Sequence, residues 1–261
     1  MHRYVKIILM TLACCWIVFV VRANIIVFDD ATYSAALLKS AQNGKAGAQN
    51  DLGTCYDMGW GIAQDKTEAI KWYRLSAEQG NAFAQNNLGT CYERGQGVEI
   101  DKAEAVKWYR LSAQKGEPIA QFNLASCYER GEGIAQDKAE AVKFYTQAAK
   151  QGSDAAQLKV GYLYATGNGV TQDKKEAFKW YRKAAQFKLG QAQFKLAECY
   201  DKGEGVLQNK QKAYYWYSVA ITNGWTEAEA SRELVGRELR AEEKIQIQKR
   251  VDKQTHIQNK L

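Results

Sequence analysis

Six cysteines and one serine–lysine pair are the clearest candidates for nucleophiles or metal ligands in this 261-residue sequence. A cysteine thiolate can attack a substrate, bind a metal ion or enter a disulfide. Beyond the first 23 residues the cysteines recur at one register, in steps of 36 residues or a multiple of 36: Cys55, Cys91, Cys127 and Cys199. Leu163 fills the position that the series skips. This spacing indicates equivalent positions in successive structural units.

Disulfide bonds between these equivalent cysteines are not expected. Equivalent positions on packed helices lie roughly 8–10 Å apart, beyond the ~7 Å Cα separation that a disulfide tolerates. We therefore expect unpaired thiols that act as small buried fillers beside a tyrosine. Two further cysteines, Cys14 and Cys15, lie in an N-terminal segment that we expect to be removed.

Ser112 and Lys115 spell S-x-x-K, the arrangement in which a lysine assists a nucleophilic serine in acyl transfer. The accompanying S-D-N and K-T-G elements occur nowhere in the sequence. The same register 36 residues earlier holds Ser76 and Gln79, without a lysine. The pair is therefore interpreted as a variant of a helix end, and we predict no catalytic residues.

The sequence gives little indication of a metal site or a phosphate-binding loop. The two histidines, His2 and His256, lie near the two ends, so no histidine–cysteine cluster is expected. Gly59-x-Gly61 and its copies lack the preceding strand and the downstream glycine of a nucleotide-binding loop. We predict no metal site and no cofactor.

A strict 36-residue repeat organises the rest of the sequence. The dipeptide Ala-Gln marks each copy, at Ala48-Gln49, Ala84-Gln85, Ala120-Gln121, Ala156-Gln157 and Ala192-Gln193. Within a copy, Ala48, Leu52 and Tyr56 share one face of a first helix, and glycines such as Gly59 then turn the chain. Repeats of this length predict a solenoid, in which each unit packs on its neighbours.

The second half of each copy predicts another helix. It opens with a D-x-x-E capping box, as in Asp65 and Glu68, and continues with a buried tryptophan–tyrosine pair among alanines. Glycine closes the copy, and Asn81 or Ser153 caps the next first helix, or Pro118 opens it. In the fourth copy Lys188 replaces the closing glycine, and Gly190 is expected to take over its turn.

The consensus A-Q-x-x-L-G-x-x-Y-x-x-G-x-G-V-x-x-D-x-x-E-A-x-x-W-Y-x-x-A-A resembles the Sel1-like repeat family, which is related to tetratricopeptide repeats. The resemblance covers residues 45–224 and implies an all-α, right-handed superhelix of five αα-hairpins that acts as an adaptor or recognition module. The family's cysteine-rich branch has two cysteines in each repeat, which this sequence lacks. Some members of that branch are described as penicillin-binding or β-lactamase-like, so this activity, through Ser112 and Lys115, is the alternative.

Resemblance to tetratricopeptide arrays implies that the first helices line the concave face and bind a protein or peptide. The predicted partner-binding residues are Asn86, Asn87, Arg94, Phe122, Asn123, Arg130, Lys159 and Tyr162. Asparagine and basic side chains can hold a peptide backbone or a carboxylate, and aromatic side chains can anchor apolar groups.

The two ends of the array are predicted to be capped. A single helix over residues 29–43, within an N-terminal segment of residues 24–44, covers the first repeat. Beyond Gly224, Thr226 and Glu229 suggest a capping box, and two helices are expected near 227–239 and 241–253, within a C-terminal region of residues 225–261. Their mixed charges are typical of a solvated outer face.

The first 23 residues resemble a signal peptide. Arg3 and Lys6 precede an apolar run over residues 7–21, and Ala23 ends a small-residue cleavage site. The run is shorter than the ~20 residues of a membrane-spanning helix, and an uncleaved inner-membrane anchor is the alternative. We therefore expect a periplasmic or secreted protein.

The formal charge of the predicted mature chain argues against nucleic acid as a partner. Cleavage removes three basic residues from a net charge of +7, and 7 − 3 = +4 is mild for a nucleic-acid-binding protein. The prediction is thus an exported, non-enzymatic repeat protein that binds a protein or peptide.

Overall fold

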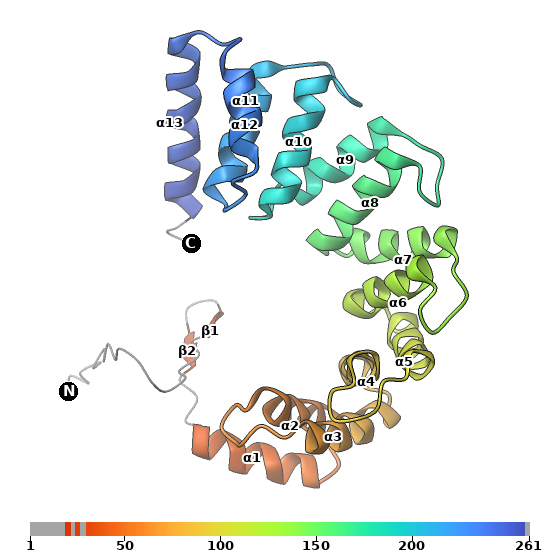
Figure 1. Ribbon diagram of the computed structural model, residues 1–261. Helices are drawn as coiled ribbons and strands as arrows, with labels where there is room; N and C mark the ends of the chain where they lie inside the picture. The colour runs from red at the N-terminus through yellow and green to blue at the C-terminus, as the bar shows by residue number, and fades with distance from the viewer. Residues whose placement is uncertain (1–18, 22–23, 27–29, 259–261) are drawn as a thin grey trace, which may run out of the picture.

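The protein is an array of helices. The computed structural model describes the backbone of residues 19–21, 24–26 and 30–258 and the side chains of residues 35–253. In this part thirteen helices follow one another, and each packs on its neighbours in the sequence, except that the last helix packs on the helix two before it. Figure 1 shows them as an open arc with α1 at one end and α13 at the other. This arrangement confirms the predicted all-α solenoid of αα-hairpins.

Five helical hairpins form the body of the arc. Their first helices are α2 (Ala46–Met58), α4 (Ala82–Arg94), α6 (Pro118–Arg130), α8 (Asp154–Thr166) and α10 (Gly190–Lys202). Their second helices are α3 (Lys66–Glu78), α5 (Lys102–Gln114), α7 (Lys138–Lys150), α9 (Lys174–Ala184) and α11 (Lys210–Thr222). The flanking helices are α1 (Asp30–Gln42), α12 (Ala228–Gly236) and α13 (Ala241–Gln258).

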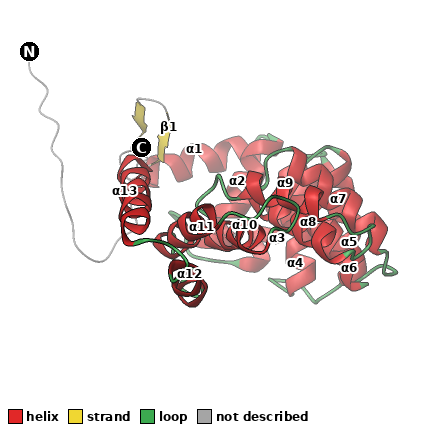
Figure 2. Ribbon diagram, turned by 90° about the horizontal axis from the view of Figure 1, so that it is seen from above, coloured by secondary structure: helices red, strands yellow, loops and turns green. Residues whose placement is uncertain are grey.

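A two-stranded antiparallel sheet precedes the helices. Strand β1 (Phe19–Val21) pairs with β2 (Asn24–Ile26), with Val20 opposite Ile25. Among the described residues these are the only strands, and Figure 2 shows them in yellow beside an otherwise helical chain. Most of the predicted leader, residues 1–18 and 22–23, lies outside the described residues.

The second helices begin where their caps were predicted. The Asp65 carboxylate accepts hydrogen bonds from the backbone N–H groups of Thr67 and Glu68, both at 2.9 Å. The equivalent residues that cap the other second helices are Asp101, Asp137, Asp173 and Asn209. The glutamates of the predicted boxes instead bond the lysine one turn later, as Lys71 does with Glu68 at 2.7 Å. The aspartate half of each box therefore provides the cap.

The first helices are joined to the preceding unit by the glutamine of the Ala-Gln dipeptide. The Gln85 side chain is buried, and its amide donates to the carbonyl of Ala77 at 3.1 Å. The same bond recurs in all five repeats, from Gln49, Gln85, Gln121, Gln157 and Gln193. It adds a second hydrogen bond to a carbonyl at the end of the preceding helix, such as that of Ala77, which also accepts one from the Gly80 N–H at 2.9 Å.

Close packing between repeats requires glycine in the turns. Gly97 has a φ of +75°, and a Cβ atom there would lie 2.4 Å from the carbonyl oxygen of Lys66 in the preceding repeat. A side chain would thus be strained in conformation and would also displace the neighbouring backbone. The turn glycines therefore set the spacing of successive hairpins.

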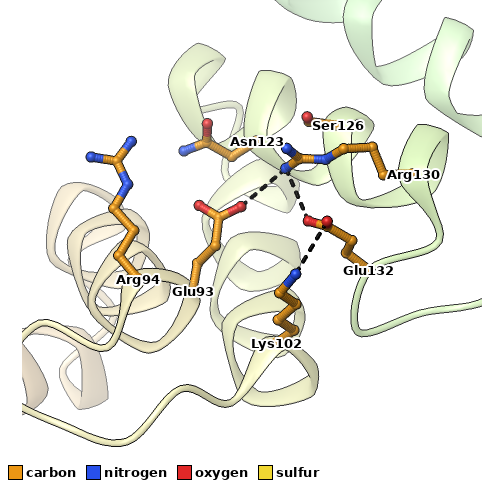
Figure 3. A pocket seen from close by; sticks show the side chains of 7 residues that line it. All are labelled: Glu93, Arg94, Lys102, Asn123, Ser126, Arg130 and Glu132. Carbon is orange, nitrogen blue, oxygen red and sulfur yellow. Dashed lines mark hydrogen bonds and ion pairs between the residues drawn. The ribbon is translucent and has the colours of Figure 1, made fainter.

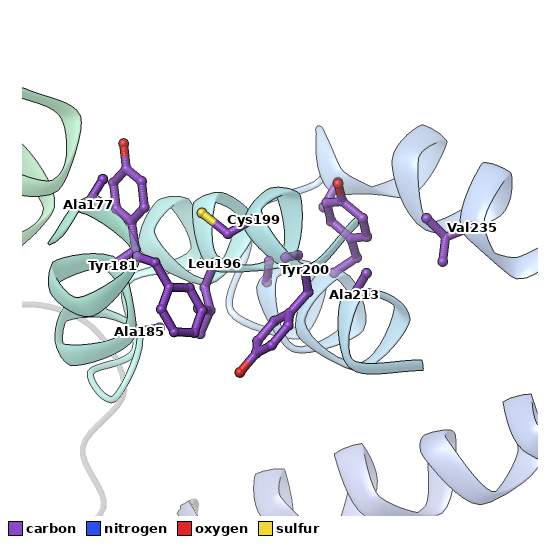
Figure 4. Packing of buried hydrophobic residues seen from close by; sticks show 13 residues of the cluster. Ala177, Tyr181, Ala185, Leu196, Cys199, Tyr200, Ala213 and Val235 are labelled. Atoms are coloured by element: carbon purple, nitrogen blue, oxygen red, sulfur yellow. The ribbon is translucent and has the colours of Figure 1, made fainter. Parts of the chain in front are cut away.

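The core is a continuous series of tyrosines, leucines and alanines. Figure 4 shows one section of it, where Tyr181 of α9, Leu196 and Cys199 of α10 and Val235 of α12 belong to one cluster. The predicted cysteine positions all lie in this core, and Cys91, Cys127 and Cys199 are free thiols. Burial raises the pKa of Cys91 to about 12, which keeps its thiol protonated at neutral pH.

Two predictions about the C-terminal half were wrong. Gly190 does not supply a turn with positive φ; it is the first residue of α10, where a Cβ atom would lie 2.7 Å from Cβ of Trp225. Glycine there permits close packing between helices. The predicted Thr226 capping box is also absent from α12, whose N-cap residue Glu227 makes no side-chain capping bond. The turn before α12 uses backbone bonds, including Glu229 N–H to the Thr226 carbonyl.

The C-terminal cap is a helical pair, as expected, with different limits. Helix α12 ends at Gly236, and α13 continues to Gln258, five residues past the predicted end at 253. Ile247 and Val251 of α13 pack against Val219 of α11 in a small apolar cluster. This packing covers the last repeat.

Candidate functional site

The eight predicted partner-binding residues lie on three consecutive first helices, α4, α6 and α8, which form the central part of the array. We call the exposed and half-buried side chains of these helices the first-helix face. The structure distributes the predicted residues among three roles: support beneath the face, a charged pocket, and an aromatic–cationic patch.

Asparagines link neighbouring first helices. The Asn87 amide donates to Oδ1 of Asn50 at 3.1 Å, and the Asn123 amide donates to Oδ1 of Asn86 at 2.9 Å. Asn86 is only 7% exposed. Its prediction as a partner-binding residue was therefore wrong, because the next repeat covers it, and it supports Asn123 from below. Asn87 and Asn123 are half-buried, each with its amide engaged in this ladder.

A charged pocket of about 410 Å³ lies between the second and third repeats. Its lining comes from α4, the start of α5, α6 and the turn after α6, and we call it the repeat 2–3 pocket: Glu93, Arg94, Lys102, Asn123, Ser126, Arg130 and Glu132. Three cations and two carboxylates give it a formal charge of +1. Three of its seven residues, Arg94, Asn123 and Arg130, were predicted to bind a partner.

A chain of ion pairs fixes most of these charges. Arg130 Nη2 lies 3.2 Å from a carboxylate oxygen of Glu93 and 3.2 Å from one of Glu132, and Lys102 Nζ lies 3.1 Å from Glu132 (Figure 3). Because Glu93 also accepts a hydrogen bond from the buried Tyr109 hydroxyl at 2.9 Å, the network is anchored to the core. Burial raises the pKa of Tyr109, so this hydroxyl stays a donor.

Arg94 differs from the other cations of the pocket. Its side chain is exposed at the end of α4, and among the described residues it forms no ion pair or hydrogen bond. Figure 3 shows its guanidinium directed away from the Glu93–Arg130 network. Its donors are therefore available to an anionic group of a ligand.

The remaining predicted residues form the aromatic–cationic patch. Lys159 Nζ lies 2.8 Å from Glu129 and above the rings of Tyr145 and Tyr162, at 5.6 and 5.9 Å from their centroids. Tyr162 is 48% exposed and can contact a partner. Phe122 is half-buried, with its ring edge-on to Tyr145 at 5.0 Å, and mainly supports the patch.

Acidic residues of the first-helix face were missed by the sequence analysis. Glu93 and Glu129 hold the predicted basic residues Arg130 and Lys159 in place. Their register was a usable signal, because it holds an acid in four of the five repeats: Asp57, Glu93, Glu129 and Asp201. Each of these acids pairs with a lysine or arginine.

Ser112 holds a structural position. It is fully buried, and its hydroxyl donates to the carbonyl of Ala82 at 2.7 Å. Ser76 makes the equivalent bond to the Ala46 carbonyl at 2.6 Å in the preceding repeat. The Lys115 ammonium donates to the carbonyl of Gly80. A substrate could not reach the Ser112 hydroxyl without opening the packing between α4 and α5.

In the described part of the chain, no three histidine, cysteine, aspartate or glutamate residues are grouped so that they could hold a metal ion. Nor does any described helix combine the length and the apolar character needed to cross a membrane. The first-helix face thus offers hydrogen-bond donors, paired charges and the exposed ring of Tyr162. These groups can recognise a polar segment of another molecule.

Comparison with known proteins agrees with this architecture. The family model described as Sel1 repeat matches residues 46–81, 82–117, 118–153, 154–186 and 190–225. A Sel1 repeat protein from Oxalobacter formigenes is 34% identical, with a TM-score of 0.67 over 74% of this chain and 85% of that chain. No curated protein matches the chain.

A second solved structure is also similar. It is c5321, a protective antigen present in uropathogenic Escherichia coli strains, which is 30% identical with a TM-score of 0.57. The match covers 87% of this chain and 56% of that chain. The Sel1 repeat fold is commonly a protein-interaction module and generally a non-catalytic scaffold. With five matched repeats and the αα-hairpin array, the chain belongs to the Sel1 repeat family.

Proposed function

We propose that this protein is an exported Sel1 repeat protein that binds a segment of another protein along its first-helix face, as an adaptor or recognition module. The observation that carries the proposal is the repeat 2–3 pocket, where a fixed ion-pair network surrounds polar space and Arg94 remains available.

The pocket is suited to an acidic peptide group. A guanidinium binds a carboxylate through two parallel hydrogen bonds, and Arg94 has no competing partner among the described residues. The ion pairs of Arg130 and Lys102 hold the surrounding charges in place, so little side-chain ordering remains for binding. Tyr162, on α8, offers an aromatic contact for a ligand that extends along the face.

A peptide-display selection with the purified protein tests this proposal. Acidic peptides should be enriched. Arg94→Ala should lower the affinity for the selected peptides about tenfold or more, because it removes a pair of charge-assisted hydrogen bonds. Lys202→Ala is the matched control, because Lys202 ends α10 at the register that Arg94 occupies in α4. Peptides that bind both variants as tightly as the wild type would refute the site.

Export is the second part of the proposal. It is supported by the basic, apolar and small-residue order of the first 23 residues. The similar E. coli protein is a protective antigen, which agrees with a location that antibodies reach. Mass spectrometry of the protein from its host should give a mature N-terminus at Asn24. An intact N-terminus in the membrane fraction would instead show the anchored form.

A further inference from the structure

A second pocket, of about 310 Å³, lies in the C-terminal cap. We call it the cap pocket; its lining comes from three helices and the turn after α12: Tyr214, Arg232, Glu233, Gly236, Arg237 and Lys244. It shares no residue with the repeat 2–3 pocket. None of its residues has a role in the binding of a protein segment proposed above.

The cap pocket is strongly positive. Arg232, Arg237 and Lys244 oppose a single carboxylate, Glu233, which gives a formal charge of +2. The C-terminal end of the α12 dipole carries only about half a negative unit charge, so it repels an anion weakly. The side chains therefore set the sign of the local potential.

The three cations of this pocket have no partners among the described residues, whereas nearby basic residues do. Lys210 pairs with Asp201 at 2.8 Å and with Glu238 at 2.9 Å, and Arg240 pairs with Glu243 at 3.3 Å. Neither Arg232, Arg237 nor Lys244 forms an ion pair or a side-chain hydrogen bond with any described residue. Glu233 offsets only one of these three charges and pairs with none of them, so the cations repel one another and an anionic ligand relieves this repulsion.

Gly236 keeps the pocket open. A Cβ atom at Gly236 would lie 2.9 Å from Cε2 of Tyr214 and 3.7 Å from Cδ of Lys244. The aromatic ring and the lysine stem therefore approach the α12 backbone closely, and they form one side of the pocket. Arg232 and Lys244 are half-buried, so solvent screens their charges less than those of fully exposed residues.

We propose that the cap pocket binds a phosphomonoester or the free phosphate ion. A phosphate dianion matches the charge of +2, and two guanidinium groups with one ammonium are the donors that proteins use for phosphate. The pocket volume is at the lower end of the range for small-molecule sites, which leaves room for a small organic substituent beside Tyr214.

Calorimetric titration of the full chain with inorganic phosphate and with O-phosphoserine at low ionic strength tests the proposal. Both probes present the oxyanion, and only the second carries an organic group. Equal affinity identifies the free ion as the ligand, and tighter phosphoserine binding identifies an ester; both outcomes support the site. Absence of binding by both probes overturns it.

Variants assign the binding to the cap pocket. The double variant Arg232→Ala, Arg237→Ala should weaken phosphate binding tenfold or more. Arg232→Lys should weaken it less, because lysine keeps the positive charge but cannot form the two parallel hydrogen bonds of a guanidinium group. Glu233→Gln should tighten binding, because it removes the opposing carboxylate. Lys249→Ala with Lys253→Ala removes the same charge from exposed positions of α13 outside the pocket. Equal weakening by this control would overturn the proposal, and circular dichroism checks that each variant is folded.

Discussion

Single side chains decide whether the buried glutamine of each repeat is fully hydrogen-bonded. In the first repeat, the Gln79 amide donates to the buried Gln49 side chain at 2.6 Å. In the third repeat, Gln151 does the same for Gln121 at 2.8 Å. The second repeat has Lys115 at this register, and Oε1 of Gln85 is left buried without a hydrogen bond. An unsatisfied buried acceptor costs about 1–3 kcal/mol.

The first prediction follows from this defect. Lys115→Gln should supply the missing donor to Gln85 and raise the free energy of unfolding by about 1 kcal/mol. Urea unfolding followed by circular dichroism measures the change. The reciprocal variant, Gln79→Lys, should lower stability by a similar amount, because it removes the donor to Gln49. A stabilising effect of both substitutions would contradict this explanation.

The second prediction separates structure from catalysis at Ser112. Ser112→Ala should lower the free energy of unfolding by about 1–2 kcal/mol, because the buried carbonyl of Ala82 loses its donor. Ser76→Ala, with the equivalent bond to Ala46, should cost about as much. A chromogenic β-lactam should be hydrolysed no faster by the wild type than by Ser112→Ala. Turnover that disappears in Ser112→Ala would establish the serine as a nucleophile.

The third prediction concerns alkaline pH. Burial raises the pKa of Cys127 to about 11 and of Cys199 to about 12, from 9.0 in the unfolded chain. A raised folded-state pKa gives stability that is complete below the unfolded pKa and is lost as pH rises through the folded pKa. The free energy of unfolding should therefore fall between pH 9 and pH 11. In Cys127→Ala the free energy of unfolding should fall less steeply with pH. An unchanged pH dependence in this variant would exclude the Cys127 thiol as a cause.

At the scale of helices, the capping residues fix where each second helix begins. The Asp137 carboxylate accepts a hydrogen bond from Glu140 N–H at 2.9 Å. Asp137→Ala should therefore lower the free energy of unfolding by about 1 kcal/mol. Lys143→Ala is the control on the same helix, because it leaves the cap intact and removes only an exposed ion pair with Glu140 and a cation–π contact with Phe144, so it should change stability little. Equal losses in both variants would show that the cap contributes nothing of its own.

The helices also divide the predicted binding residues into accessible and inaccessible ones. Asn86 and Asn87 are adjacent in sequence, yet the neighbouring repeat buries Asn86 and leaves Asn87 half-buried. On a helix, one residue corresponds to a rotation of about 100°. A single position along α4 therefore separates the interior from the first-helix face.

At the scale of the whole molecule, an array of stacked repeats needs covered ends, since each repeat has an apolar side that its neighbour buries. Helix α13 provides this cover at the C-terminal end through Ile247 and Val251. Ile247 is 6% exposed, whereas Ile245 on the same helix is 55% exposed.

The fifth prediction tests this cap. Ile247→Ala should lower the free energy of unfolding by about 2–4 kcal/mol, because it leaves a cavity against α11. Ile245→Ala should have little effect, since its side chain is already solvated. Hydrogen exchange should show that the loss of protection in Ile247→Ala is greatest in α11 and α13, because repeats contact mainly their neighbours. A uniform loss along the array would contradict nearest-neighbour coupling.

The repeat length, the helical hairpins, the aspartate caps and the burial of the cysteines were all predictable from the amino-acid sequence. These features depend on residue spacing within one helix or one turn, and the same spacing recurs in each of the five repeats. The first-helix face was predicted from the resemblance to tetratricopeptide arrays, and Arg94, Arg130, Lys159 and Tyr162 lie at its surface or edge.

Which of these side chains are available to a partner depends on the packing of neighbouring repeats. The pairing of Arg130 with Glu93 joins residues 37 positions apart, and the burial of Asn86 depends on how two first helices cross. The cap pocket likewise brings Tyr214 of the last repeat together with side chains of α12, the turn after it and α13, a region that lies outside the repeats. Local spacing fixes the face of a helix on which a residue lies, but the neighbouring helix determines whether that face is covered, paired or open to solvent.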